Sequence, residues 1–123
     1  MYAIILAGGD GTRLRPFTND IPKPMVEIGG KPILEHLIVQ LKKAGIEDVI
    51  LAEGYKAEII QNYFEDGQKW EIRIHHIDGL DSKVGSAKAV KESLLTIPKD
   101  DLCEDVFIGL GDIFIRHGLF TTY

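Results

Sequence analysis

The sequence predicts an α/β fold with a mostly parallel sheet. Short apolar runs alternate with stretches of helical periodicity in the order strand, helix, strand, helix, strand, helix, strand. This alternation is typical of parallel strands joined by crossover helices. The first run, residues 3–6, is apolar at consecutive positions, as expected for a strand covered on both faces. A length of 123 residues is enough for one domain with its own core.

The first half of the chain contains two predicted strands and two predicted helices. Pro32 suits the first turn of a helix, apolar residues then recur at helical spacing, and Gly45 marks the end of that helix. A second apolar stripe includes Ile60 and Phe64. The predicted ranges are strand 2–6, loop 8–24, extended piece 25–28, helix 32–43, strand 48–52 and helix 55–64.

The second half completes the alternation. Trp70, Ile72 and Ile74 alternate with polar residues, which predicts a third strand. The next helix is expected to direct four apolar residues inward, namely Ala87, Val90, Leu94 and Leu95. The predicted ranges are strand 70–74, polar loop 76–84, helix 85–97, surface turn 98–105 and strand 106–110. The remaining residues, 113–123, are mostly apolar without a clear closing element, so we expect a truncated fold.

The loop after the first strand carries the residue types that bind phosphate. Glycines allow backbone N–H groups to approach a ligand closely, and successive N–H groups form an anion-binding concavity. Arginine and lysine then supply positive charge to phosphate oxygens. The glycines are Gly8, Gly9 and Gly11, and the hydroxyl and cationic residues are Thr12, Arg13, Arg15 and Lys23. The pattern predicts a loop that binds a nucleotide through its phosphates.

Composition excludes several classes of function. A formal net charge of −5 argues against a general nucleic-acid-binding protein. The single cysteine, Cys103, cannot form an internal disulfide and fits a reducing compartment. No apolar run has membrane-spanning length, and the N-terminus lacks the features of a signal peptide. We therefore expect a cytoplasmic protein without nucleic-acid or membrane partners.

Two familiar phosphate loops fit the sequence poorly. The P-loop requires a Gly-Lys-Ser/Thr motif before a helix, and the chain has none. The dinucleotide-binding fingerprint requires a third glycine at the opening of a helix, whereas Arg13 and Leu14 follow Gly11 here. The glycine loop therefore belongs to neither of these two kinds of nucleotide-binding loop.

The segment LAGGDGTRLRPFTNDIPKPMVEIGGKPILEHL, together with Gly54-Tyr55, resembles the sugar-1-phosphate nucleotidyltransferase family. The resemblance covers the chain up to Asp112, weakening after Phe64, and rests on a long pattern in which G-x-G-T-R-L is followed by Pro-Lys-Pro. It implies a Rossmann-like three-layer α/β/α fold. Family members are longer, so residues 1–123 are expected to form only the N-terminal, nucleotide-binding portion of the nucleotidyltransferase domain.

The resemblance implies a reaction and a set of site residues. A sugar 1-phosphate oxygen attacks the α-phosphorus of an NTP, pyrophosphate leaves, and an NDP-sugar forms. Arg13 and Lys23 are implied as catalytic cations, and Asp112 as the ligand of a magnesium ion (Mg²⁺), the expected cofactor. The implied nucleotide-binding residues are Leu6, Ala7, Gly8, Gly9, Gly11, Thr12, Arg13 and Gly85.

Some positions depart from the family pattern or leave alternatives open. Lys88 stands where the family often has glycine, and it could meet phosphate or point to solvent. Glu53 stands before Gly54-Tyr55 where a neutral or small residue is usual. His75 and His76 should lie on opposite faces of a strand, so they should not share a metal.

Other functions remain to be weighed against an enzyme. The same fold could serve as a non-catalytic nucleotide-binding module of a regulatory or assembly subunit, and a weaker alternative is a NAD-type dehydrogenase domain. An uncovered sheet edge after the fourth strand would favour self-association, and thus a homo-oligomer, or marginal stability.

Overall fold

A four-stranded parallel sheet forms the centre of the structure. The structure is a computed structural model, and it describes residues 2–8, 21–79, 86–98 and 106–111. The strands are β1 (Tyr2–Ala7), β4 (Asp48–Glu53), β5 (Arg73–Ile77) and β6 (Val106–Leu110), and their order across the sheet is β5-β4-β1-β6. The predicted parallel sheet is therefore confirmed, and the first, second and fourth strands lie where the sequence predicts them.

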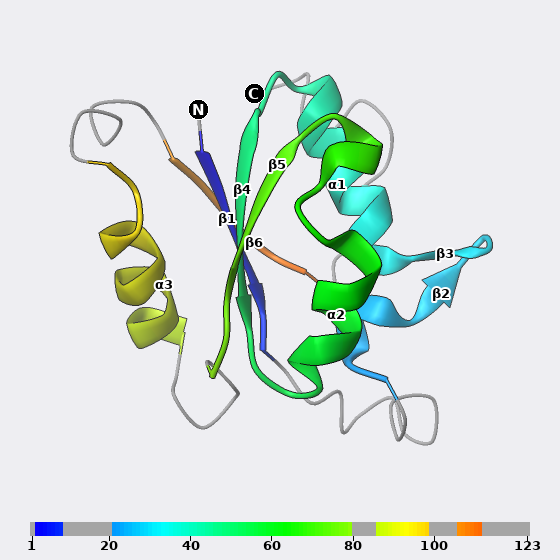
Figure 1. The fold of residues 1–123 in the computed structure, drawn as a ribbon, viewed down its shortest axis with the longest axis horizontal. Helices are drawn as coiled ribbons and strands as arrows, with labels where there is room; N and C mark the ends of the chain where they lie inside the picture. The colour runs from blue at the N-terminus through cyan, green and yellow to red at the C-terminus, as the bar shows by residue number, and fades with distance from the viewer. Residues whose placement is uncertain (1, 9–20, 80–85, 99–105, 112–123) are drawn as a thin grey trace.

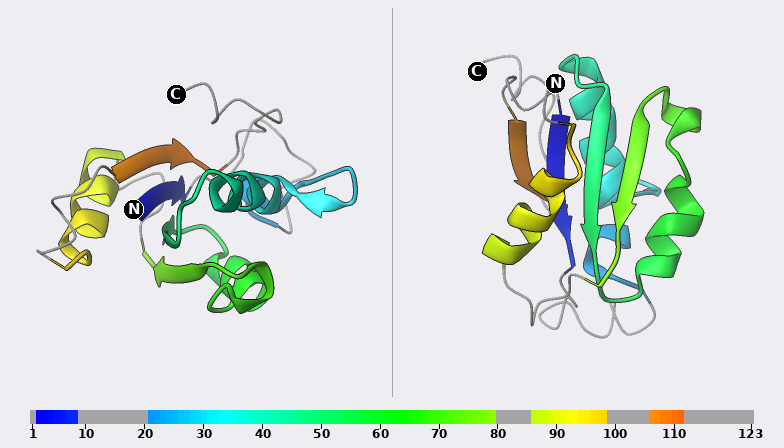
Figure 2. Two further views of the ribbon diagram at one scale, coloured as in Figure 1. Left: turned by 90° about the horizontal axis from the view of Figure 1, so that it is seen from above. Right: turned by 60° about the vertical axis from the view of Figure 1, so that its left-hand side comes forward.

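Helices cover both faces of the sheet. The helices α1 (Ile33–Lys43) and α2 (Ala57–Phe64) lie on one face, and α3 (Ser86–Leu95) lies on the other (Figures 1 and 2). The predicted α/β/α layering is confirmed. None of the helices in the described ranges combines the length and the apolar character needed to cross a membrane.

The register places the carboxyl ends of three strands together. Ala7, the last residue of β1, lies opposite Glu53, the last residue of β4. On the other side of β1, Leu6 lies opposite Leu110 at the end of β6. In parallel sheets of this kind, ligands bind beyond the carboxyl ends of the strands.

Two cores sandwich the sheet. Because side chains alternate along a strand, odd-numbered residues of β1 and β4 face α1 and α2, and even-numbered residues face α3. The larger core includes Ile5, Leu37 and Phe64, which are at most 1% exposed. The smaller core joins Ile4 and Ile50 to Ile97, which follows α3.

A small hairpin precedes α1. The strands β2 (Glu27–Ile28) and β3 (Lys31–Pro32) are antiparallel, and they replace the single extended piece predicted at 25–28. Gly29 and Gly30 form the turn with φ values of +64° and +82°, a backbone conformation that residues with a Cβ rarely adopt. The hairpin fixes the start of α1, since the Ile33 N–H donates to the Val26 carbonyl at 2.9 Å.

The third predicted strand begins too early. Trp70 belongs to a short 3-10 helix, η3 (Gln68–Trp70), and β5 starts only at Arg73. The left-handed backbone of Glu71, with φ of 58°, separates the two elements. The polar loop predicted from 76 is also wrong at its start, because β5 continues to Ile77.

The predicted inward face of α3 is partly wrong. Ala87 and Leu95 are exposed, Leu95 by 71%, whereas Ala89, Ser93 and Ile97 are buried. These three residues are four positions apart, so they form one stripe. Ala89 and Ser93 are small and let the helix approach the sheet, and the Ser93 hydroxyl is satisfied by donating to the Ala89 carbonyl at 2.8 Å.

Candidate functional site

The start of the predicted phosphate loop lies at the carboxyl edge of the sheet. Leu6 and Ala7 are the last residues of β1, and Gly8 is the first residue after it. The other loop residues of interest lie outside the described residues, namely Gly9, Gly11, Thr12, Arg13 and Arg15. The structure thus fixes the point from which the loop departs, and the roles of its residues stay predictions.

Gly111 meets the end of β1. Its N–H donates to the Leu6 carbonyl at 2.9 Å. A Cβ at this position would lie 3.2 Å from Ile5 Cγ2 and 3.3 Å from Ala7 Cβ, so only a glycine fits without displacing these neighbours. Two segments about a hundred residues apart, the start of the glycine loop and Gly111, therefore converge as a parallel sheet predicts. Asp112 itself lies outside the described residues.

The first turn of α3 lies over the same edge. Ala89 packs in a cluster with Ala52 and Leu6, close to the ends of β4 and β1. The amino terminus of a helix carries a partial positive charge that favours anions. Lys88 in this turn is exposed, and Gly85, directly before α3, lies outside the described residues.

Lys23 sits in a rigid support. It begins the 3-10 helix η2 (Lys23–Met25), where Pro24 and Met25 are buried, and the Met25 N–H donates to the Pro22 carbonyl at 2.9 Å. Lys23 is half-buried, and η2 packs against α1. Figure 1 shows η2 in the lower half of the molecule, the half in which β1 and β4 end. Fixed prolines on both sides give this lysine a defined backbone position.

A buried polar cluster that the sequence did not predict lies beside this edge. Glu53, opposite Ala7, is 0% exposed. Its carboxylate accepts a hydrogen bond from Gln61 Nε2 at 3.1 Å and pairs with His76 Nδ1. The signal in the sequence was the departure at Glu53, but its partners come from α2 and β5 and no local pattern identifies them.

The environment raises the pKa of both members of this pair. Burial raises the pKa of Glu53, and the hydrogen bonds from His76 and Gln61 oppose this shift only in part. Burial lowers the pKa of His76, but its hydrogen bonds to Glu53 and to the Glu65 carbonyl, with the charge of Glu53, outweigh burial. Asp78, after β5, adds negative charge that raises the pKa of Glu53 further.

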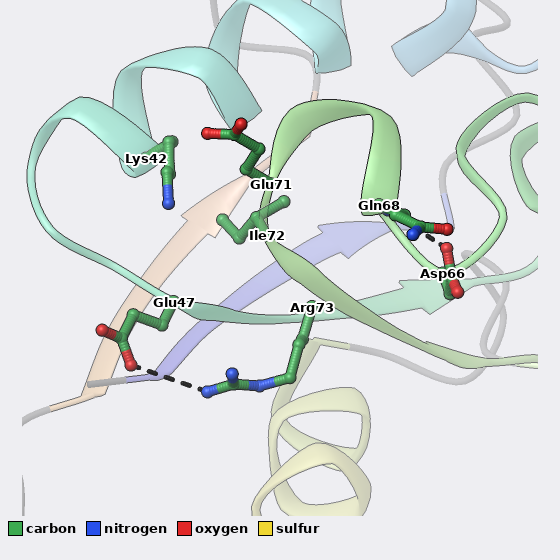
Figure 3. A pocket seen from close by; sticks show the side chains of 7 residues that line it. All are labelled: Lys42, Glu47, Asp66, Gln68, Glu71, Ile72 and Arg73. Carbon is green, nitrogen blue, oxygen red and sulfur yellow. Dashed lines mark hydrogen bonds and ion pairs between the residues drawn. The ribbon is translucent and has the colours of Figure 1, made fainter.

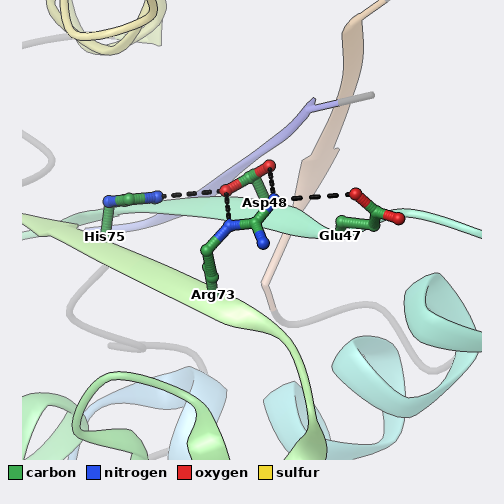
Figure 4. A network of polar contacts seen from close by, with 4 residues as sticks. All are labelled: Glu47, Asp48, Arg73 and His75. Carbon is green, nitrogen blue, oxygen red and sulfur yellow. Dashed lines mark hydrogen bonds and ion pairs between the residues drawn. The ribbon is translucent and has the colours of Figure 1, made fainter.

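A second ionic cluster lies at the opposite edge of the same strands (Figure 4). Arg73 donates to both carboxylate oxygens of Asp48, at 2.7 and 2.8 Å, and His75 Nε2 lies 3.4 Å from Asp48 Oδ1. The bond from Arg73 lowers the pKa of Asp48. Asp48 begins β4, so this cluster lies far from the glycine loop along the strand. The prediction that His75 and His76 face opposite ways is confirmed, since they have different carboxylate partners.

One pocket of about 500 Å³ lies at the amino-terminal edge of β4 and β5 (Figure 3). Its lining mixes both signs of charge, and its residues are Lys42, Glu47, Asp66, Gln68, Glu71, Ile72 and Arg73. Of the predicted nucleotide-binding residues, those that the structure describes, Leu6, Ala7 and Gly8, do not line it. Within the described ranges, no group of three or more His, Cys, Asp or Glu residues could hold a metal ion.

Known proteins are similar to this chain over most of its length. The nucleotidyl transferase family profile matches residues 2–123. A D-glycero-α-D-manno-heptose 1-phosphate guanylyltransferase of Campylobacter jejuni is 47% identical over 117 residues, covering 93% of this chain and 48% of the relative. A UTP–glucose-1-phosphate uridylyltransferase of Haloferax volcanii is 43% identical over 112 residues, covering 91% of this chain and 43% of the relative.

A solved structure extends the similarity to the fold. HddC from Yersinia pseudotuberculosis, complexed with GMP-PN, matches with a TM-score of 0.74 and 34% identity, over 90% of this chain and 47% of that chain. The chain thus spans about half the length of the relatives that it matches. The family profile, the relatives and the fold agree with the meeting of Gly111 and the start of the glycine loop at one edge of the sheet: the chain belongs to the nucleotidyl transferase family.

Proposed function

We propose that this protein transfers a nucleoside monophosphate from an NTP to a sugar 1-phosphate, giving an NDP-sugar and pyrophosphate. The observation that carries the proposal is the meeting of Gly8, Gly111 and the first turn of α3 at the carboxyl edge of the sheet. Membership of the nucleotidyl transferase family supports it, as do relatives named as transferases that act on sugar 1-phosphates.

The nucleotide would lie along this edge. Leu6 to Gly9 would line the base and ribose, with Gly85 against the base, and the amino terminus of α3 would add its favourable potential for anions. Gly11, Thr12 and Arg13 would hold the triphosphate through backbone N–H groups and the guanidinium.

Catalysis would rest on positioning and charge neutralisation, without a protein nucleophile. A phosphate oxygen of the sugar 1-phosphate attacks the α-phosphorus, the bond from that phosphorus to the bridging oxygen breaks, and pyrophosphate leaves with the electron pair. Arg13 would neutralise the departing pyrophosphate. Lys23 would neutralise the α-phosphate and the incoming sugar phosphate, which otherwise repel each other.

Asp112 would hold a magnesium ion. The contact between Gly111 and Leu6 supports this role, because it anchors the residue before Asp112 beside the start of the phosphate loop. A carboxylate oxygen is a hard ligand of the type that Mg²⁺ prefers. When bound, the ion would supply positive charge to the phosphate oxygens.

The relatives suggest which nucleotide to test first. The Campylobacter relative is named as a guanylyltransferase, and the Yersinia structure holds GMP-PN. GTP is therefore the first candidate and UTP the second, after the Haloferax relative. A cytoplasmic location fits both an NTP substrate and the single cysteine, Cys103.

Pyrophosphate release tests the proposal. The intact protein is incubated with each NTP, each of several sugar 1-phosphates and Mg²⁺, and we expect release that depends on all three. Arg13→Ala and Lys23→Ala should each lower turnover by roughly 10²- to 10³-fold, the range for loss of a group that stabilises transition-state charge. The thermal unfolding midpoint of each variant should match that of the wild type.

Three other outcomes have distinct meanings. Nucleotide binding without pyrophosphate release would favour the non-catalytic module. Binding of NAD instead of any NTP would favour a dehydrogenase-type domain. Near-normal turnover in Arg13→Ala or Lys23→Ala would show that the assigned residue is not catalytic.

A further inference from the structure

Glu53 is an unusual residue for its position. It follows Val49 and Leu51 on the same face of β4, and all three are 0% exposed. A carboxylate in such a place costs considerable free energy unless it is paired and hydrogen-bonded. Glu53 is paired, and its hydrogen bonds connect β4 to neighbouring elements, which a leucine at this position could not do.

The pair joins three elements at one point. Glu53 ends β4, His76 lies near the end of β5, and Gln61 lies on α2. His76 also uses its second ring nitrogen, Nε2, which donates to the carbonyl of Glu65 just after α2. The end of β4 is thereby tied both to its neighbouring strand and to the helix that covers it.

The geometry requires a proton between Glu53 and His76. The Glu65 carbonyl can only accept, so Nε2 of His76 carries a hydrogen. A contact between Nδ1 and a carboxylate oxygen then exists only if one of the two carries a proton. Loss of that proton would bring a lone pair of the imidazole against a buried carboxylate.

The pair lies beside the start of the glycine loop. Glu53 and Ala7 are register partners on the same face of adjacent strands, and Gly8 follows Ala7 directly. On the other side, Glu53 leads into the Gly54-Tyr55 turn, where the Ala57 N–H donates to the Gly54 carbonyl at 3.1 Å. A shift of the end of β4 would therefore act on both segments at the candidate site.

We propose, resting on the proposed function, that Glu53 and His76 are positioning residues: their shared proton holds the end of β4, and with it the start of the glycine loop, in the geometry that binds the nucleotide. Neither residue touches the nucleotide. Among the described residues, Asp78 after β5 adds negative charge beside the pair, Glu65 contributes its backbone carbonyl, and Gln61 is the polar neighbour on α2. Nucleotide affinity should fall as pH rises and the shared proton is lost.

The chain offers matched controls for this proposal. Glu53→Gln removes the carboxylate charge of the pair, and His76→Gln removes its imidazole ring. Asp48→Asn and His75→Gln make the same changes in the cluster at the other edge of the same two strands, on the other face. All four variants remove a member of an ionic cluster, but only the first pair lies beside the start of the glycine loop. Asp48 is buried like Glu53, whereas the His75 side chain is 51% exposed and that of His76 is 19% exposed.

The dissociation constant of the bound NTP is measured by calorimetry across a pH series. Glu53→Gln and His76→Gln should weaken NTP binding on the order of tenfold, because the start of the glycine loop is then no longer held in its binding geometry. His76→Gln should also differ from His75→Gln in its pH profile, a comparison that cancels the titration of the nucleotide itself. The control variants should bind within about twofold of the wild type.

Equal weakening in the controls, or wild-type affinity and pH profile in the Glu53 and His76 variants, would overturn the positioning role. If the wild type binds no NTP, the proposed function is wrong, and hydrogen exchange still decides the positioning role. Relative to each variant's own global unfolding free energy, amides of residues 2–8 should then exchange faster in Glu53→Gln than in Asp48→Asn, and equal relative rates would contradict it. Should Glu53→Gln fail to fold, Gln61→Met leaves the pair intact and should show a smaller loss in the same direction.

Discussion

At the scale of single residues, two carboxylates on β4 have opposite environments. Asp48 begins the strand and has its pKa lowered by Arg73, whereas Glu53 ends it and has its pKa raised by burial. A strand of six residues thus carries one group that favours the charged state and one that resists it. The two groups should affect stability in different ranges of pH.

Asp48→Asn should destabilise the fold at neutral pH. The Asp48 side chain is only 10% exposed, whereas its partner Arg73 is 65% exposed, so solvent screens the contact and its contribution to stability is modest. Because the folded-state pKa is lowered, this stability is present above the ordinary value of 3.8 and is lost as pH falls through the folded pKa. Urea unfolding midpoints at several pH values should show a deficit at neutral pH that shrinks below 3.8. A deficit independent of pH would contradict the ionic origin.

His76→Gln should change the stability of the fold at neutral and alkaline pH instead. Both Glu53 and His76 have raised pKa values, so the folded state binds more protons than the unfolded state from 4.5 upwards. Stability from His76 is fully present below its ordinary value of 6.5 and is lost as pH rises through the folded pKa. The wild-type unfolding midpoint should therefore decline over this range more steeply than that of the variant. Parallel curves would show that the pair does not titrate as described.

The residue scale also shows what a sequence cannot predict. Glu53 was visible as an odd residue before Gly54-Tyr55, yet its partners, His76 and Gln61, come from other elements. Only the register of β5 against β4 brings the imidazole to the carboxylate. Buried pairs of this kind follow from tertiary structure, and no periodicity encodes them.

At the scale of elements, α1 and α2 are joined by a polar contact within an apolar layer. The Tyr63 hydroxyl donates to Glu35, which is 6% exposed, and Lys31 Nζ lies 3.8 Å from the same carboxylate. The bond to Glu35, with burial and the charges of Glu35 and Glu27, raises the pKa of Tyr63 to about 12. The Tyr63 hydroxyl therefore keeps its proton across the pH range in which proteins are usually studied. It remains the donor of the hydrogen bond to Glu35.

Tyr63→Phe should weaken the packing of α2 against α1. The substitution keeps the ring but removes the hydroxyl donor from a buried carboxylate, which then has only the 3.8 Å ion pair with Lys31, at a cost of about 1–3 kcal/mol. Urea unfolding at neutral pH measures this change. Leu95→Ala is a suitable control, since its side chain is 71% exposed and its loss should cost less than about 0.5 kcal/mol. Equal effects of the two substitutions would exclude a specific role for the hydroxyl.

Periodicity predicted the elements but not all of their limits. The alternation of Trp70, Ile72 and Ile74 resembled a strand, yet Trp70 lies in a 3-10 turn. From there its ring packs on Phe64 and Tyr63, with ring centroids 5.0 and 5.9 Å apart. In α3, two of the four apolar residues expected inward are exposed, because the tight fit to the sheet favours the small residues Ala89 and Ser93. Side-chain size and tertiary contacts decide where such elements begin and which face is buried. A pattern of apolar and polar residues contains neither.

At the scale of the whole molecule, the sequence predicted which strand ends meet better than it predicted the details around them. Parallel strand order alone implies that the ends of β1 and β6 meet, and the Gly111–Leu6 contact confirms it. Under the proposed function, the base and the sugar would be chosen by side chains and loops whose arrangement is not encoded in local patterns. The relatives include guanylyl- and uridylyltransferases, so the same framework accepts different bases.

A ligand that binds across this edge should stabilise the whole domain. Because a nucleotide at the carboxyl edge would contact β1, α3 and the segment after β6 together, it binds only the folded state. Linkage then predicts a gain of about 2.7 kcal/mol at a hundredfold excess over the dissociation constant. Thermal unfolding with each NTP and Mg²⁺ should show a shift that grows with the logarithm of concentration and is largest for the nucleotide used in pyrophosphate release. NAD at the same concentrations is the control, and a shift with NAD alone would place a different ligand at this edge of the sheet.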